Sequence, residues 1–204
     1  MKIKGYLFKD VVLNPVIRFL IYSDILMMSG WGLITPIIAV FITDKIPGGN
    51  VAVAGLASTL YFLVKCFLQI PVARYIDKHK GENDDFVIML MGSLIITLCA
   101  FLYIFVNNVF HLYLLQVLYG VGGALSYPSW LALFTRHIDK HEEGLEWSLY
   151  YTTTDLGSAL TAGLGGLMAS NFGYDWVFIM VGLTSLFGTL FLFGIRHFLY
   201  KHSY

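Results

Sequence analysis

The chain has 204 residues, of which 57% are apolar and 13% are charged, and its formal net charge at pH 7 is zero. Charged residues are about half as frequent as in an average soluble domain, where they make up roughly 25%. A chain of this length encloses too little interior to hide so much apolar surface. The composition therefore excludes an ordinary soluble fold and indicates an all-α membrane protein.

Six apolar stretches follow one another along the chain, and each is long enough to cross a bilayer, which takes roughly 20 helical residues. They cover Pro15–Ile42, Val51–Tyr75, Phe86–Val106, Leu112–Thr135, Leu145–Ser170 and Val177–Ile195. Asn14 can cap the first helix, and Pro15 suits its first position, where a missing N–H costs nothing. Because the connections are short, we expect one domain, residues 1–204, of six antiparallel transmembrane helices.

Positive charge gathers at every second gap between the spans. Eleven lysines and arginines lie at the start of the chain, in the second and fourth gaps and after the sixth span: Lys2, Lys4, Lys9, Arg18, Arg74, Lys78, Lys80, Arg136, Lys140, Arg196 and Lys201. The other three gaps together hold only Lys45. Under the positive-inside rule this bias predicts a protein of the cytoplasmic (inner) membrane with both termini in the cytoplasm. The first apolar run is too long for a signal peptide, so no cleavage is expected.

A weak internal repeat relates the first three spans to the last three. Span one contains Gly30-Trp-Gly-Leu-Ile-Thr-Pro36, and span four contains Gly122-Gly-Ala-Leu-Ser-Tyr-Pro128. Because each unit has three spans, the second would be inverted in the membrane, an arrangement typical of transporters. Chance is the alternative explanation, since glycine and proline are common in membrane helices.

Three motifs resemble those of the major facilitator superfamily. The gap after span two reads Ala73-Arg-Tyr-Ile-Asp77-Lys78-His-Lys80-Gly81, similar to the family's Gly-x-Leu-Ala-Asp-Arg-x-Gly-Arg loop. Span four contains Gln116-Val-Leu-Tyr119-Gly120-Val-Gly122, where the family often has Arg-x-x-Gln-Gly-x-Gly. Span five has Gly157 and Gly165-Gly166 at glycines of the family's exporter motif, while Thr161-Ala162 replace its Gly-Pro.

The resemblance implies one six-helix half of a major facilitator fold, whereas family members normally have twelve spans. It implies a secondary active transporter of a small solute that works by alternating access, with protons as a potential coupling ion. Two copies would supply the twelve helices as a homodimer. The alternative is a scaffold or accessory half-subunit that pairs with another membrane protein and transports nothing. In the family, helices three and six of each half pack outside, and the others line the cavity.

Three ionisable residues fall well inside the spans, namely Asp24, Lys65 and Asp155. Such residues are costly in a bilayer and usually face a cavity or one another. From the helix rise, all three should lie near one depth. Asp24 and Lys65 either bind substrate or form a structural ion pair between spans one and two. If those two pair, Asp155 remains as the acid that could carry a proton.

Further candidates surround these charges or sit at the helix ends. Polar and aromatic residues at membrane depth are Tyr22, Trp31, Thr35, Tyr61, Gln69, Gln116, Tyr119, Tyr127 and Trp130; of these, Trp31, Gln116, Tyr119 and Tyr127 are the leading substrate or proton ligands. Asp77, Lys78 and Arg136 are expected to act as a conformational latch between cytoplasmic helix ends, with solvated loop charges as the alternative. Gly30, Gly122, Gly157, Gly163, Gly165 and Gly166 are expected to allow close helix packing.

The sequence gives little support to other classes of function. It contains no zinc-protease, nucleophile-elbow or nucleotide-binding motif, so neither an enzyme nor a bound cofactor is expected. Asp24 and Asp155 lack the sequence context of an intramembrane aspartyl pair. The histidines and acids of residues 137–143 have no firm metal-ligand spacing, so no metal site is predicted. Cys66 and Cys99 both fall mid-span and are expected to be small packing residues.

Overall fold

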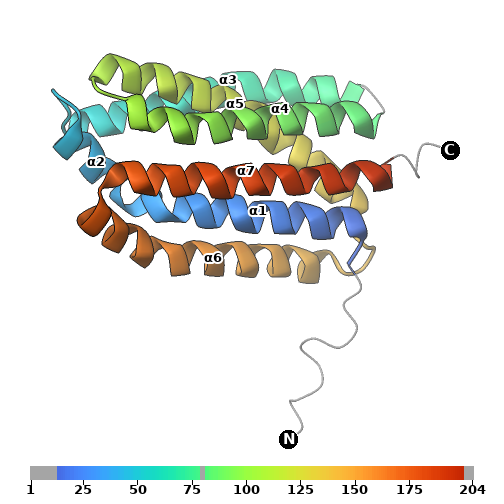
Figure 1. The fold of residues 1–204 in the computed structure, drawn as a ribbon. Helices are drawn as coiled ribbons and strands as arrows, with labels where there is room; N and C mark the ends of the chain where they lie inside the picture. Colours follow the sequence, from blue (N-terminus) through green and yellow to red (C-terminus); the bar gives the residue numbers. More distant parts are fainter. Residues whose placement is uncertain (1–12, 79–80, 200–204) are drawn as a thin grey trace, which may run out of the picture.

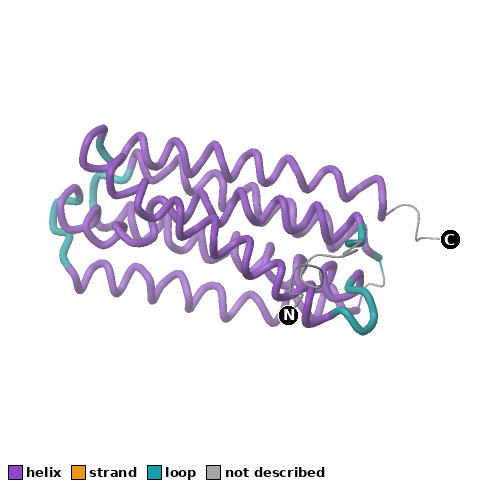
Figure 2. Tube along the Cα trace, turned by 90° about the horizontal axis from the view of Figure 1, so that it is seen from below, coloured by secondary structure: helices purple, strands orange, loops and turns teal. Residues whose placement is uncertain are grey.

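A computed structural model describes residues 13–78 and 81–199, which form helices and short connections without a β-strand. The elements are α1 (Pro15–Ile34), η1 (Thr35–Ile37), α2 (Ile38–Lys45), α3 (Val51–Lys78), α4 (Glu82–Leu102), η2 (Tyr103–Phe105), α5 (Val109–His137), α6 (Glu143–Phe172) and α7 (Tyr174–Leu199) (Figure 1). The connections gather at the two ends of the bundle (Figure 2). Five of the counted positive charges, Lys2, Lys4, Lys9, Lys80 and Lys201, lie outside the described residues.

Several helices extend beyond the apolar runs because polar residues continue them, whereas α1 and α3 begin where their runs begin. The predicted cap of the first helix is confirmed, since the backbone N–H of Val16 donates to Asn14 Oδ1 at 2.9 Å. The helix α4 begins at Glu82, and its first turn also contains Asp84 and Asp85. Carboxylates at this end of a helix interact favourably with the helix dipole. The acids before the third apolar run are therefore part of that helix.

The first predicted span is broken in its C-terminal half. Pro36 lies in the 3₁₀ turn η1, which separates α1 from the short helix α2. Proline lacks the N–H that an α-helix needs and crowds the preceding turn, so a short 3₁₀ segment is a natural result. By contrast, Pro71 in α3 and Pro128 in α5 both lie inside continuous helices.

Five stretches of the described residues are long and apolar enough to cross a membrane: Pro15–Lys45, Val51–Lys78, Glu82–Phe105, Val109–His137 and Tyr174–Leu199. The helix α6 has 30 residues but is less apolar and is not one of these five, so the predicted span Leu145–Ser170 stays a prediction. Its sequence carries Glu146, Asp155 and several serines, threonines and glycines.

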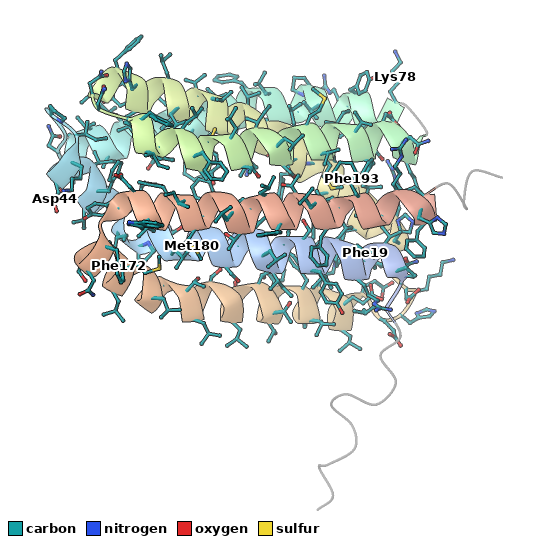
Figure 3. All side chains as sticks on the ribbon, in the orientation of Figure 1. Phe19, Asp44, Lys78, Phe172, Met180 and Phe193 are labelled. Carbon is teal, nitrogen blue, oxygen red and sulfur yellow. The ribbon has the colours of Figure 1, made fainter. Side chains whose placement is uncertain are left out.

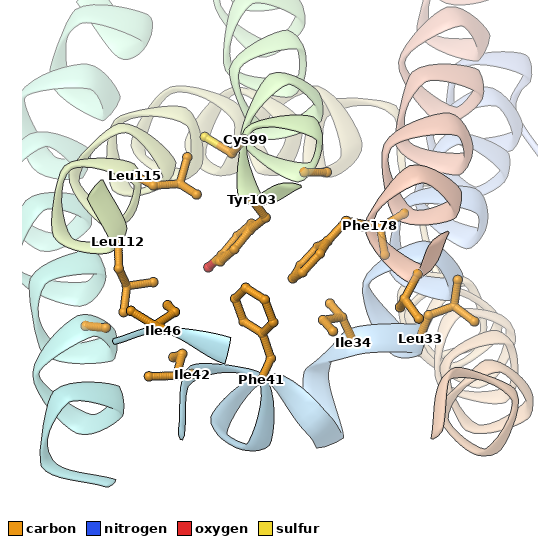
Figure 4. Packing of buried hydrophobic residues seen from close by; sticks show 14 residues of the cluster. Leu33, Ile34, Phe41, Ile42, Ile46, Cys99, Tyr103, Leu112, Leu115 and Phe178 are labelled. Carbon is orange, nitrogen blue, oxygen red and sulfur yellow. The ribbon is translucent and has the colours of Figure 1, made fainter. Parts of the chain in front are cut away.

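The helices pack in two groups of three, visible one above the other in Figure 1. One group has α1 between α6 and α7, the other has α5 between α3 and α4, and α4 against α7 is the main link. A buried aromatic cluster joins the groups near α2, where the rings of Tyr103 and Phe178 stack with centroids 4.8 Å apart and Phe41 meets both edge-on (Figure 4). The arrangement of two inverted repeats remains a prediction.

Glycines mark the closest helix approaches. A Cβ would collide with Thr184 at Gly30, with Ile95 and Ile96 at Gly122, with Ser29 at Gly157 and with the Leu33 carbonyl at Gly165, whereas at Gly163 and Gly166 it would meet nothing within 4 Å. The last two glycines therefore face open space in this chain and not a neighbouring helix. Cys66 is likewise exposed on α3, unlike Cys99, which is buried.

Adjacent glycines of α6 give a matched test of this packing. We expect Gly165→Ala to destabilise the protein by about 1–3 kcal/mol, because the new methyl group overlaps a backbone carbonyl of α1 that cannot move freely. Gly166→Ala should be neutral or stabilise by up to about 1 kcal/mol, since alanine favours helix and the site is open. Thermal unfolding of both variants in one detergent measures the difference; equal stabilities would contradict the packing.

The predicted topology can be tested at both ends of the bundle. Figure 3 shows Asp44 and Phe172 at one end and Lys78 at the other. Cysteines introduced at Asn50, Asn108 and Asn171, in a background without Cys66, should react with an impermeant reagent on intact cells. A cysteine at His141 should not react. Labelling at His141 in place of the asparagines would invert the topology. The equivalent position His79 lies outside the described residues.

Candidate functional site

Two cavities meet at a stack of three aromatic rings. Tyr119 of α5 lies between Trp31 of α1 and Tyr61 of α3, with ring centroids 4.6 and 4.7 Å apart and planes tilted by 23° and 26°. All three rings line both cavities, as does Thr35. The stack therefore ties three helices together where the two cavities adjoin.

The first cavity, which we call the α2-side cavity, has a volume of about 460 Å³. It is formed by the C-terminal end of α1, by η1 and α2, and by the first turns of α3. Gln116 and Tyr103 close one wall, where the Gln116 amide Nε2 donates to the Tyr103 hydroxyl at 2.6 Å. The carboxamide predicted as a substrate ligand is thus already held by a buried tyrosine. No charged side chain lines this cavity within the described residues.

The second cavity, which we call the charged cavity, has a volume of about 410 Å³ and contains both Asp24 and Lys65. The hydroxyl of Tyr150, on α6, donates to Asp24 Oδ2 at 2.9 Å. The Lys65 ammonium lies 4.7 Å from the ring centroid of Tyr127 and 5.9 Å from that of Tyr61, where each ring face attracts a cation. Each charge is therefore contacted by a tyrosine of another helix, Asp24 by Tyr150 of α6 and Lys65 by Tyr127 of α5.

This geometry bears on one of the two alternatives for Asp24 and Lys65, the structural ion pair between spans one and two. The ion pairs found among the described residues join Arg136 to Asp85 and His137 to Glu82, and neither involves the two charges of the cavity. A direct Asp24–Lys65 pair between the first two spans is therefore not formed in this structure. Both side chains instead line the same space from different helices.

Asp155 does not lie in the charged cavity. It is exposed on α6 and lines neither cavity. Tyr150 bonds to Asp24, and Asp155 follows it by five residues, which is about 7.5 Å along the helix and well around its circumference. The shared depth of the three residues stays a prediction, and an estimate of depth carries no information on the direction of a side chain. This placement also separates Asp155 from any aspartyl pair with Asp24.

Some of the other polar and aromatic residues predicted from the sequence line the charged cavity, and others line neither cavity. Thr35, Tyr61, Tyr127 and Trp130 line the charged cavity, whereas Gln69 and Tyr22 line neither cavity. Sequence reasoning missed Tyr150, the residue whose hydroxyl bonds to Asp24. It precedes the threonine run of α6, but a single tyrosine among several carries no signal of its role without the fold.

A group of charges lies where α4 begins and α5 ends. The Arg136 guanidinium bonds to Asp85, whose side chain is fully buried, and His137 Nε2 lies 3.6 Å from Glu82 Oε1. Asp77 and Lys78, the other two predicted latch residues, are exposed at the end of α3. The structure therefore ties Arg136 to an acid at the start of α4 and not to the Asp77–Lys78 pair. Asp85 was missed because it reads as one of several acids in a first helical turn.

This arrangement suits binding far better than covalent chemistry. A cavity with a few polar groups among aromatic walls, open between helices, is typical of small-molecule sites. The described residues contain no group of three or more metal-ligating side chains. The site therefore offers one carboxylate, one ammonium and several rings to a small solute.

Comparison with known proteins agrees with this description. A sequence profile of the Major Facilitator Superfamily matches residues 20–202. The chain is 29% identical over 164 residues to "Multi-drug resistance efflux pump PmrA homolog" of Lactococcus lactis subsp. lactis (strain IL1403), a match that covers 79% of this chain and 39% of that protein. It is 26% identical over 124 residues to "Dipeptide and tripeptide permease B" of Aliivibrio fischeri (strain MJ11), covering 57% of this chain and 25% of that protein.

A solved structure shares the fold. The POT family transporter PepTSo superposes with a TM-score of 0.73 at 19% identity, over 91% of this chain and 38% of that one. The chain thus spans about two fifths or less of the length of each of these relatives. At this identity the likeness to PepTSo concerns the fold alone.

Proposed function

Because the chain belongs to the Major Facilitator Superfamily, and its relatives are transporters, we propose that it carries a small solute by alternating access as one half of a paired secondary transporter. The observation that carries the proposal is the charged cavity, in which Asp24 and Lys65 face one space at membrane depth. Charges so costly in a bilayer are usually kept where they bind a substrate or ion.

The aromatic stack is the part of the site that a passing solute must displace. Trp31, Tyr119 and Tyr61 lie where the α2-side cavity adjoins the charged cavity. In alternating access, one side of the binding site closes as the other opens. Separation of the stacked rings as α1 and α3 tilt would join the two cavities, and restacking would divide them again.

A second half is needed to enclose the cavity, and we propose that a second copy supplies it. Only Glu146, Thr154 and Gly165 are buried along α6, and only 11% of the most apolar stretch of α3 is buried, against 39–44% in the other spans. The exposed surface of α6 includes Asp155, an acid that lipid would solvate poorly. A symmetric partner would cover these two helices, which explains why α6 is less apolar than a lipid-facing span.

The pairing predicts a defined mass in mild detergent. Native mass spectrometry should show a species of about 46 kDa, twice the 23.0 kDa of one chain. A charged substitution at the open glycine, Gly166→Arg, should shift the population to 23.0 kDa. The matched substitution at the exposed start of the same helix, Gly144→Arg, where a side chain also meets nothing within 4 Å, should not. A functional species that is strictly monomeric would contradict the second copy, and a complex of another mass would point to a different partner.

Transport itself is tested by flux. The purified protein reconstituted in liposomes should give saturable uptake that a gradient of the same solute, or of protons, can drive. The efflux and peptide transport named for the relatives suggest small organic solutes as the first panel. A scaffold or accessory half-subunit, the competing role, predicts no uptake above that of protein-free liposomes.

A further inference from the structure

The composition of the charged cavity indicates the charge that its ligand carries, an inference that rests on the proposed function. Asp24 and Lys65 are the two charged side chains that line it, and the other lining residues of the described chain are neutral. The cavity therefore contributes one negative and one positive group. A ligand that enters it displaces water from both.

The two charges are supported separately. Tyr150 holds the Asp24 carboxylate through one hydrogen bond, and Tyr127 faces the Lys65 ammonium through its ring. Neither arrangement neutralises the charge, because a hydroxyl and a ring face are both uncharged. In a direct ion pair, Asp24 and Lys65 would neutralise each other and leave no uncompensated charge for a ligand. The structure does not form that pair.

The affinity of this cavity for a ligand should depend on the charges that the ligand carries. An anion would compensate Lys65 and leave Asp24 desolvated without an opposite charge, and a cation would do the reverse. A stranded charge in a low dielectric is strongly unfavourable, which gives selectivity against such ligands. A ligand that carries both charges compensates both groups, and aromatic side chains offer its apolar part a surface on which to pack.

The neighbouring tryptophans add a second observation. The indole Nε1–H groups of Trp31 and Trp130, which both line the charged cavity, are buried without an acceptor. Buried donors are nearly always paired in folded proteins, so an unpaired one calls for a missing partner. Each of these donors therefore lacks an acceptor from the protein, beside a cavity that would hold a polar ligand.

We propose that the charged cavity binds a small zwitterion with an aromatic or apolar body, whose cationic group is recognised by Asp24 and whose anionic group is recognised by Lys65. The cavity volume of about 410 Å³ lies within the range of sites that bind small organic molecules. The proposal concerns the charge pattern of the solute and applies to whichever zwitterion the protein carries.

The test uses sets of compounds that share one shape. The first set is 4-(aminomethyl)benzoate, which carries both charges, with its isosteres 4-methylbenzoate and 4-methylbenzylamine, which carry one each. The second set is phenylalanine with 3-phenylpropanoate and 2-phenylethylamine, in which the two charges are closer together. Equilibrium binding to the purified protein is measured by calorimetry. We expect at least one zwitterion to bind about 10-fold more tightly or better than both of its partners.

Two variants then assign the charges. Asp24→Asn should weaken the zwitterion about 10-fold and abolish its advantage over the matching anion, while Lys65→Met should abolish its advantage over the matching cation. Asp44→Asn and Lys45→Met, which remove exposed charges of α2, should change neither. Tyr150→Phe, which keeps the Asp24 charge, should retain the preference for the zwitterion even if Asp24→Asn folds poorly.

The outcomes separate this inference from the proposed function. If neither zwitterion binds more tightly than its singly charged partners, or if both variants weaken anion and cation equally, the inference is wrong. Saturable uptake of a singly charged or neutral solute would overturn the inference and leave the transporter intact. Absence of uptake of every solute would overturn the proposed function itself.

Discussion

Replacing Arg136 with glutamine is expected to destabilise the protein by about 3 kcal/mol, the largest loss of stability among the substitutions considered. The change leaves the carboxylate of Asp85, which is fully buried, without its cationic partner. Breaking a buried ion pair from one side typically costs about 3–5 kcal/mol. Because 37% of the Arg136 side chain is exposed, water weakens the pair, and the low end of that range applies.

The double variant identifies the cause of that loss. Asp85→Asn together with Arg136→Gln should recover at least half of the stability, because no charge is then stranded in the bundle. Lys140→Gln, which removes an exposed charge of the connection that follows α5, should leave the melting temperature unchanged. Thermal unfolding in detergent measures all four proteins. If Arg136→Gln has the same melting temperature as the wild type, the Arg136–Asp85 pair does not stabilise the packing of α4 against α5.

The largest loss of transport is expected from Asp24→Asn. A carboxylate that contacts a ligand charge inside a cavity typically contributes about 2–5 kcal/mol, so uptake at limiting solute should fall about 30-fold or more. Tyr150→Phe should reduce uptake less, about 10-fold, because it removes the hydrogen bond to Asp24 and keeps the charge. Initial rates in liposomes that contain equal amounts of protein measure both effects.

A double substitution distinguishes this account from a structural ion pair. If Asp24 and Lys65 mainly neutralised each other, Asp24→Asn with Lys65→Met would recover part of the loss from either change alone. The separate tyrosine partners predict no recovery, because each residue loses its own contact with the solute. The same variants also test whether Asp24 carries a coupling proton. If it does, uptake should lose its pH dependence in every variant that contains Asp24→Asn and keep it in Lys65→Met alone. Recovery of transport in the double variant would contradict the separate roles.

The sequence predicted the helices and the family because those signals are local or cumulative. Asn14 and Pro15 specify a helix start within two residues, and the apolar runs need no knowledge of contacts. The family emerged from several weak motifs in the right order, and the profile match over residues 20–202 confirms it. The span predicted over α6 remains a prediction, because that helix is less apolar than the five others that could cross a membrane.

The partners within the site were beyond sequence reasoning for a physical reason. Tyr150 and Asp24 are 126 residues apart, and Arg136 and Asp85 are 51 apart, so their meeting depends on how whole helices pack. Depth along a helix can be estimated from its rise, but the direction of a side chain depends on the rotation of the helix in the bundle. Asp155 shows this difference, because an estimate of depth alone placed it with Asp24 and the structure turns it outward.

The most direct measurement is the reactivity of a cysteine placed between the two cavities. Thr35 is exposed and lines both, at the level of the aromatic stack. Thr35→Cys, in a background without Cys66 and Cys99, is reconstituted in liposomes and treated with an impermeant thiol reagent from one side at a time. Asp44→Cys, beyond the stack, serves as the one-sided control. Alternating access predicts that Thr35→Cys reacts from either side while the liposomes remain sealed to the reagent. Reaction from one side alone, under every gradient applied, would contradict the account.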